Sequence, residues 1–438
     1  MRKFIYLILT LTSITNTQLL YAQELNKLQV NLQDLFNLAD SNSRSLQISI
    51  YQQETAAENL KQQKNRMLPS VDVSLSFTNY GTGWVTDRNF SNTVSAEIPH
   101  FGDNFAFNAT EIIYAGGVLK TSVKVAQLGL LIAKLEKEKN KQDIRFLIAG
   151  YYLELQKIEN QTSILQHNLQ QTNVLLNQIQ HKFRQGTALK NAVTRYELQK
   201  QSLDLSLLKL ENGRQIINNE LVNTLLLTKG TILVIKKSSN ALLDSVSSEE
   251  WQKIATQNAP AFKQMVNRVK SASHMVALAK SDRLPQIFAF ASHNIGGPIL
   301  VEVPPLNKNL IYWSAGVGIK YNIASIYQSG SKIKTAKIAE KIAIENNALV
   351  KEQLSNDIQS ATILYQEAKD VYHTQLKSVQ LANENYNVVR NRYLADLVLI
   401  TEMLDAENSK IEAEMQAANA QINILFRFYQ LNKISGTL

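Results

Sequence analysis

The sequence predicts a mostly α-helical chain of long antiparallel coiled-coil helices, with four strands that form one portion of a membrane β-barrel. Three observations support this fold class. Residues 117–186 contain no proline and carry apolar residues at steps of three, four and seven, which indicates one long amphipathic helix of roughly 100 Å. Residues 71–78 alternate strictly between apolar and polar side chains, as in a strand with one apolar face. Both kinds of segment occur twice along the chain.

The first 22 residues are predicted to be a secretory signal peptide. Arg2 and Lys3 precede an apolar run over residues 4–11, and a polar stretch then leads to Ala22. This arrangement favours export and cleavage after Ala22. The apolar run is too short for a membrane-spanning helix, which needs about 20 residues. No later window has the length and apolarity of such a helix either.

The composition excludes several classes of function. The 438 residues include no cysteine, which removes disulfides, thiolate metal sites, cysteine nucleophiles and a lipid anchor on cysteine. The formal net charge is +9, but basic residues alternate with acidic ones along the predicted helices. We therefore expect solvated helix faces and no nucleic-acid partner.

The chain is predicted to be an internal duplication, with a first structural repeat over residues 23–236 and a second over 237–438. Short segments match in the same order at offsets that fall from 216 to 206, from the helix starts at 38–43 and 254–259 to the Gly-Thr segments at the two ends. Each repeat has a helix that stops at Leu-Pro, a strand, a loop, a second strand, a long helix and a return helix. The second long helix is expected over 330–396.

The apolar face of the predicted strands points to a membrane. Residues 286–293 are too uniformly apolar for their faces to be assigned. A sandwich core would explain the alternation of the other strands equally well, but the long helices leave no compact body for a sandwich. A barrel completed by other subunits would remove the exposed sheet edges. The residues expected to face lipid are Val71, Val73, Leu75, Phe77 and Trp313.

The last helix is predicted to carry a coiled-coil seam. Leu404, Ile411 and Met415 begin a 4–3 spacing that continues to Tyr429 and is interrupted by Asn408. A single asparagine in such a seam can fix its register. We expect seams of this kind both within a subunit and between subunits.

With these features the chain resembles the TolC-type outer-membrane efflux protein family over about residues 30–438. The likeness rests on the duplicated order of elements, the two Leu-Pro strand entries, the Tyr-Ala-Gly-Gly segment at 114–117 and residues 393–406. It implies a homotrimer whose subunits share a twelve-stranded barrel in outer-membrane lipid and a periplasmic tunnel. Such trimers are the exit ducts of tripartite efflux pumps or type I secretion systems in Gram-negative bacteria. The implied partners are a periplasmic adaptor (membrane fusion) protein and an inner-membrane transporter of the RND, ABC or MFS type.

The resemblance also implies a gate and two adaptor-contacting tips. Tyr393, Glu402 and Asp405 stand at the positions of the family's pore constriction, and a threefold ring of the two carboxylates would favour cations. The alternative is that both acids complement the dipole of their helix. Val398 and Ala192 stand where other members carry a tip arginine and a third gate acid, so this gate network is thinner. The expected tip contacts are Arg184, Gly186, Leu189, Asp396 and Leu397, with Asp396 in place of a glycine.

We expect neither an enzyme nor a cofactor or metal site. The six histidines are scattered without a pair at ligand spacing, and no glycine-rich phosphate loop follows a strand. The alternative function is an exported, non-channel coiled-coil adaptor or scaffold in the periplasm. A scaffold has no need for a lipid-facing strand, so the strand at 71–77 favours the duct.

Overall fold

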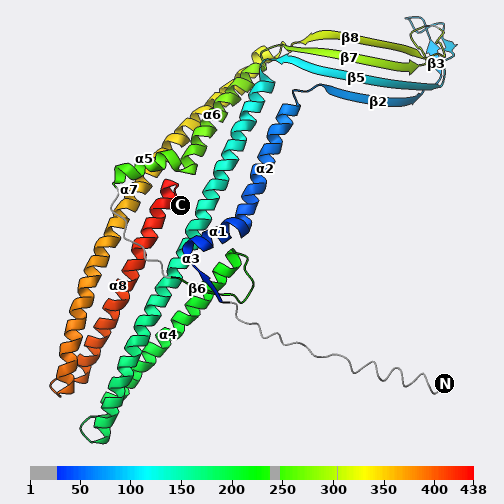
Figure 1. The fold of residues 1–438 in the computed structure, drawn as a ribbon. Coiled ribbons are helices and arrows are strands. Elements are labelled where there is room, and N and C mark those ends of the chain that lie inside the picture. The colour runs from blue at the N-terminus through cyan, green and yellow to red at the C-terminus, as the bar shows by residue number, and fades with distance from the viewer. Residues whose placement is uncertain (1–26, 237–246, 303) are drawn as a thin grey trace, which may run out of the picture.

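The chain forms an elongated bundle of helices with a curved sheet at one end (Figure 1). This computed structural model describes residues 27–236, 247–302 and 304–438. The predicted signal peptide over residues 1–22 lies outside that part of the chain. Within it, no helix is long and apolar enough to cross a membrane.

Two very long helices run through the bundle, as predicted. Helix α3, Val118–Arg184, has 67 residues, and helix α7, Ser325–Leu394, has 70 residues. The limits of α3 agree with the predicted 117–186. The start of α7 was predicted too late at Gly330, because a turn at Asn322 already begins the helix, and its side chain accepts a hydrogen bond from the Ala324 N–H at 3.2 Å.

A pair of glycines joins the sheet to α3. Gly116 and Gly117 have φ angles of 61° and 82°, a left-handed backbone that other residues rarely adopt. A Cβ atom on Gly116 would lie 2.9 Å from both Cβ of Leu284 and the carbonyl oxygen of Ser281. The close packing of this joint against the end of the α6 helix therefore requires glycine.

The same order of elements occurs in both halves of the chain. Helices α1 and α5 have 11 residues each, α2 and α6 have 22 each, and the return helices α4 and α8 have 35 and 36. Their bounds are Leu32–Asn42 (α1), Arg44–Asn65 (α2), Lys190–Thr224 (α4), Ser248–Asn258 (α5), Pro260–Ser281 (α6) and Ile400–Ser435 (α8).

One predicted helix start is instead a joint between two helices. Residues 38–42 end α1, and Ser43 both follows α1 and caps α2, where its hydroxyl accepts from the Leu46 N–H. The division of the chain at 236/237 stays a prediction, since residues 237–246 lie outside the described part.

The four predicted strands form one antiparallel sheet in the order β2-β5-β7-β8. One row across it contains Val73, Phe107, His293 and Trp313. The apolar residues of β2 therefore share a face with Trp313. That face is open in the single chain, because the four β2 residues are 57–65% exposed and Trp313 is 75% exposed. The bounds are Ser70–Asn79 (β2), Phe101–Ala115 (β5), Gln286–Gly297 (β7) and Leu310–Lys320 (β8).

The register of the sheet resolves the faces of β7, which the sequence left open. Phe288 and Phe290 lie on the face opposite Trp313, directly across from Gly318 and Gly316. A Cβ atom on Gly318 would come within 2.6 Å of the Phe288 ring. The two glycines thus make room for aromatic rings on the otherwise polar face of the sheet.

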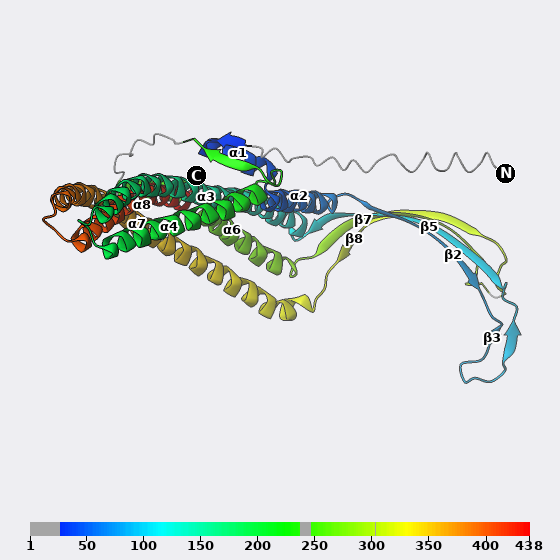
Figure 2. The ribbon, with the colours of Figure 1, turned by 90° about the horizontal axis from the view of Figure 1, so that it is seen from below.

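Two small sheets complete the fold, and neither was predicted. Strands β1 (Lys27–Val30) and β6 (Ile232–Ile235) pair in parallel near the middle of the bundle, beside α1. Strands β3 (Gly83–Val85) and β4 (Val94–Ala96) form a hairpin in the loop between β2 and β5, beyond the far end of the main sheet (Figure 2).

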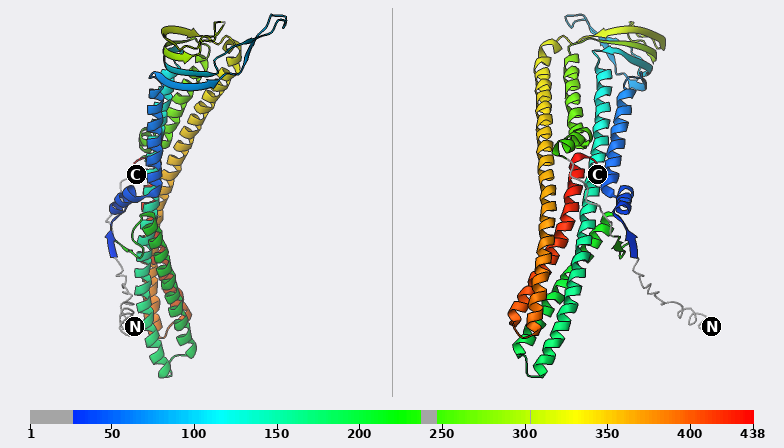
Figure 3. Two further views of the ribbon diagram at one scale, coloured as in Figure 1. Left: turned by 90° about the vertical axis from the view of Figure 1, so that its right-hand side faces the viewer. Right: turned by 60° about the vertical axis from the view of Figure 1, so that its left-hand side comes forward.

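The long helices change neighbours along their length (Figure 3). Near the sheet the adjacent pairs are α2 with α3, α3 with α6, and α6 with α7. Beyond the middle, α4 and α8 take over, so that α3 packs against both and α8 packs against α7. The tips of the two helical hairpins, α3–α4 and α7–α8, lie together at the end opposite the sheet (Figure 1).

Candidate functional site at the helical tips

The two hairpins turn by the same backbone motif. After α3, the Thr187 N–H donates to the Lys182 carbonyl at 2.9 Å; after α7, the Leu397 N–H donates to the Arg392 carbonyl at 2.9 Å. This six-to-one bond closes a Schellman turn, which needs a left-handed residue just after the helix. Gly186 supplies it in the first tip with a φ of 77°.

Asp396 supplies the left-handed residue in the second tip. Its φ is 59°, which aspartate tolerates better than most side chains. Its carboxylate accepts a hydrogen bond from Lys182 Nζ at 2.6 Å. Unlike glycine, this residue therefore closes its own turn and links the second tip to the first.

The other predicted contact residues also lie at the tips. Arg184 ends α3, and Leu189 precedes α4. The side chains of Leu189 and Leu397 are 77% and 73% exposed. Leu399 at the second tip is 69% exposed, so both hairpins present large apolar residues to solvent at this end of the bundle.

The structure brings two of the three predicted gate residues to one exposed helix face. Glu402 and Asp405 lie in the first turns of α8, three residues apart and both exposed. Among the described residues, neither carboxylate has an ion pair or a side-chain hydrogen bond. Tyr393 is half-buried instead, and burial, followed by the nearby charge of Asp396, raises its pKa.

Tyr393 belongs to a hydrophobic cluster that joins the two hairpins. Residues from all four helices meet here, and Tyr196 and Met403 are completely buried. Ala192, at the position where the resemblance implied a third gate acid, lies in the same cluster and packs as an apolar residue. The buried members are Leu175, Leu176, Ile179, Ala192, Tyr196, Tyr386 and Met403.

A row of polar contacts runs between α3 and α8 above this cluster, and we call it the polar seam. In it, Gln161 Nε2 donates to Asn419 at 2.7 Å, and Asn168 Nδ2 donates to Glu414 at 2.9 Å. Lys410 Nζ donates to Gln171 Oε1 at 2.8 Å and lies 4.7 Å from the centre of the Tyr386 ring. Lys410 is buried, so the seam holds a charged group inside the helix packing.

Glu407 ends the polar seam and is only 1% exposed. Its Oε1 accepts from the Thr172 hydroxyl at 2.5 Å, and the same hydroxyl lies 3.0 Å from the Asn168 carbonyl oxygen. A hydroxyl has one hydrogen, which these two acceptors must share, and a neutral Glu407 that donates to Thr172 would remove this competition.

The surroundings of Glu407 favour this neutral form. Burial raises its pKa, against opposing effects of Thr172, Tyr196 and Lys410. Burial and the adjacent Glu407 in turn raise the pKa of Tyr196. The Tyr196 hydroxyl and Glu407 Oε2 lack a well-aligned hydrogen bond, which would be costly for a buried carboxylate and less so for a carboxylic acid.

Several residues of the predicted seam of the last helix pack within the single chain: Ile422 is buried, and Leu404, Leu425 and Tyr429 are partly buried against the hydrophobic clusters. Asn408 is exposed and accepts from Gln199 Nε2 at 2.7 Å, whereas its neighbour Glu407 is buried. The buried face of α8 uses small and polar residues, including Ala406, Ala413 and Ala420 at steps of seven. Sequence reasoning missed this face because it followed the larger apolar residues; the seven-residue alanine spacing was the signal available.

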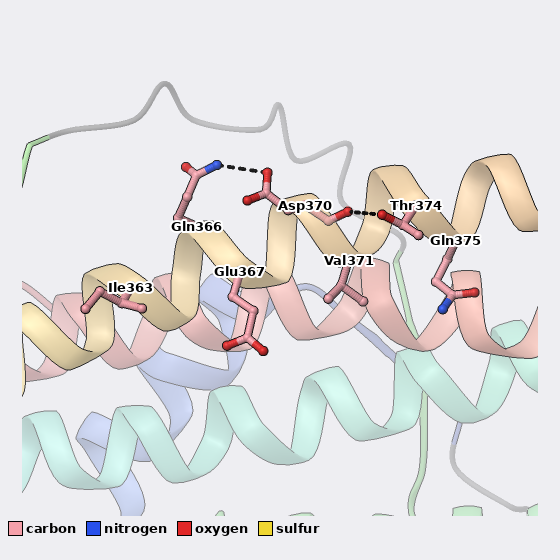
Figure 4. A pocket seen from close by; sticks show the side chains of 7 residues that line it. All are labelled: Ile363, Gln366, Glu367, Asp370, Val371, Thr374 and Gln375. Atoms are coloured by element: carbon pink, nitrogen blue, oxygen red, sulfur yellow. Dashed lines mark hydrogen bonds between the residues drawn. The ribbon is translucent and has the colours of Figure 1, made fainter.

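Outside the tips, open grooves lie on the helical surface, including one of about 1010 Å³ lined by residues of α3, α6 and α7. Another groove of about 510 Å³ lies along the exposed side of α7 (Figure 4). Its polar groups bind each other, since Gln366 Nε2 donates to Asp370 Oδ1 at 3.1 Å. In the described ranges no group of three or more His, Cys, Asp or Glu residues is placed to hold a metal ion. The lining residues are Ile363, Gln366, Glu367, Asp370, Val371, Thr374 and Gln375.

Residues 251–437 match the outer membrane efflux protein family. The matched part runs from α5 to α8. The fold of the chain is similar to that of the outer membrane protein VceC from Vibrio cholerae, with 16% identity, a TM-score of 0.77, and coverage of 92% of this chain and 96% of that chain. The outer-membrane channel OprN has 13% identity, a TM-score of 0.79, and coverage of 93% of this chain and 90% of that chain. The Campylobacter jejuni outer membrane channel CmeC has 15% identity, a TM-score of 0.74, and coverage of 93% of this chain and 85% of that chain.

These comparisons confirm the resemblance predicted from the sequence. The chain is mostly helical and has the fold of outer-membrane channels, and its residues 251–437 match a family of outer membrane efflux proteins. No curated protein sequence matches the chain.

Proposed function

We propose that this protein is the outer-membrane exit duct of a tripartite efflux pump or a type I secretion system. The observation that carries the proposal is the open sheet. One face exposes apolar side chains in every strand, and the outer edges of β2 and β8 pair with no other strand in the described chain. Three copies of the sheet, joined edge to edge, would close a twelve-stranded barrel with its apolar face toward lipid.

The surface of α7 supports assembly with further copies. Ile342, Leu349 and Ile363 are exposed at multiples of seven residues. Nearer the tip, Leu381 and Val388 are a second exposed pair seven residues apart. Spacing of this kind is typical of a helix seam, and no helix of the same chain covers these residues. The groove in Figure 4 lies in this stretch of α7, where a neighbouring helix of the trimer would pack.

The decisive experiment separates membrane from soluble fractions and then compares heated with unheated samples by gel electrophoresis. A duct is recovered with the outer membrane as a trimer that heating converts to monomer. A soluble monomer would instead support an exported coiled-coil adaptor or scaffold in the periplasm. The free sheet edges make the trimer the expected result.

We also propose that Glu402 and Asp405 line the pore constriction, beside Tyr393. Their exposure without ion-pair partners leaves both carboxylates available to an axis shared by three subunits. A ring of six carboxylates favours cations, so divalent or trivalent cations should block conductance from the periplasmic side. Single-channel recordings should show that Asp405→Ala relieves the block, while Glu412→Ala, two turns further along α8, leaves it unchanged. An unchanged block in Asp405→Ala would exclude this gate.

The helical tips are proposed to contact a periplasmic adaptor protein that links the duct to an inner-membrane transporter. Leu189 and Leu397 are the exposed apolar anchors, and Arg184, Gly186 and Asp396 shape the turns around them. Cysteine crosslinking from Leu189→Cys to a co-purified adaptor tests this contact. The grooves found on the described surface are open rather than enclosed, which is consistent with cargo selection by the transporter rather than by the duct.

A further inference from the structure

The positive charge of this chain is concentrated where the helices meet the sheet. Four segments join long helices to strands: 57–69, 111–127, 273–285 and 318–338. Together they contain eleven Lys and Arg residues and three Asp and Glu residues, a net charge of +8. The whole chain has 46 basic and 37 acidic residues, a net charge of +9. The rest of the protein is therefore almost neutral, and we call these four segments the basic band.

The fold brings the basic band together at one level. The end of α2, the start of α3, the end of α6 and the start of α7 all lie next to the sheet (Figures 1 and 3). All eleven basic side chains are exposed. Only two have an acidic partner in the described chain, Lys61 with Glu58 and Lys332 with Asp282. Nine cationic groups thus have no ion pair there.

The basic band is continuous with the apolar face of the sheet. Ile319, Ile323 and Tyr327 are exposed at the junction between β8 and α7, and Leu68 is exposed at the entry to β2. Apolar and aromatic side chains next to unpaired lysines are typical of the boundary between a membrane and water. Lysine can bury its carbon chain at such a boundary while its ammonium group reaches the headgroups.

We propose that the basic band binds the anionic headgroups of phospholipids in the periplasmic leaflet of the outer membrane. This inference rests on the proposed function, since it requires the sheet to lie in that membrane. Several exposed cations close to an anionic surface bind it cooperatively through their summed potential. The bound lipids would fix the depth of the sheet in the bilayer, which its apolar strands alone define only loosely.

Native mass spectrometry of the purified full-length trimer tests the proposal, with equimolar phosphatidylglycerol and phosphatidylcholine as probes. The wild type should retain phosphatidylglycerol in preference. The triple variant Lys124→Gln, Lys334→Gln, Lys337→Gln should lower this preference at least about tenfold, because each cation near an anionic surface contributes about fivefold. The matched control is Lys190→Gln, Lys209→Gln, Lys351→Gln, which removes three exposed lysines outside the band and should leave the preference unchanged.

Three results would overturn the proposal. The first is equal retention of both lipids by an intact wild-type trimer. The second is an equal loss of preference in both triple variants. The third is displacement of the lipid by water-soluble glycerol phosphate, which would assign the band to free anions such as an anionic cargo. Absence of a trimer would instead contradict the proposed function, so the two failures are distinguishable.

Discussion

The two ends of the long helices are held in different ways. At the sheet end, backbone hydrogen bonds join the strands, while apolar side chains and unpaired lysines face outward. At the tip end, side chains from four helices form a buried cluster. We therefore expect the sheet end to depend on partners outside the chain, whereas the tip end is stabilised within it.

A charge on the open face of the sheet should prevent assembly. In Leu75→Arg, a lipid-facing charge near the bilayer centre costs about 2–4 kcal/mol in each subunit. The unheated gel should therefore show loss of the trimer from the outer-membrane fraction. Ser76→Arg places the same side chain on the opposite, polar face and should retain the trimer. Equal loss in both variants would contradict a lipid-facing role for this face.

A cavity in the tip cluster should weaken the helical end without affecting assembly. Met403 is completely buried, and Met403→Ala should lower the free energy of unfolding by about 2–5 kcal/mol. Thermal unfolding followed by circular dichroism measures this change, with the exposed Leu397→Ala as the control. A trimer that assembles normally but melts earlier would confirm that the two ends are stabilised separately.

The polar seam should make the stability of the tips depend on pH. Burial raises the pKa of Glu407 in the folded protein, so its stabilising effect is complete below the unfolded pKa and falls as pH rises through the folded one. The melting temperature should therefore be higher near about pH 5 than near about pH 8. Glu407→Gln should flatten this dependence, while the exposed Glu412→Gln should preserve it. The same slope in wild type and Glu407→Gln would exclude Glu407 as its source.

The ion pair between the tips should have the smallest effect. Lys182→Gln removes the partner of Asp396, whose side chain is 71% exposed, and solvent-exposed pairs contribute at most about 1 kcal/mol. Chemical denaturation should show a loss within that limit, and Lys190→Gln should show none. A loss of several kcal/mol would mean that this contact, rather than the buried cluster, holds the hairpins together.

The sequence predicted features that depend on local pattern. The limits of α3 follow from its glycines and the absence of proline, and the apolar face of β2 follows from strict alternation. The faces of β7 required the register with β8, because Phe288 and Ala289 are both apolar. Glu407 was missed because its burial depends on Thr172 and Tyr196 from two other helices. The basic band was missed because its four segments are brought together only by the fold.

Helix α3 is joined to the sheet through Gly116 and Gly117, so a small change of angle at this joint becomes a large displacement at the far end of the helix. With a length of roughly 100 Å, a rotation of one degree at this joint would move the far end by about 1.7 Å, slightly more than the rise of about 1.5 Å per helical residue. The two glycines alone therefore cannot fix the position of the tips accurately. The position of the tips therefore has to be set by the contacts between the two hairpins. The buried cluster and the Schellman turns thus align the tips as well as stabilise them.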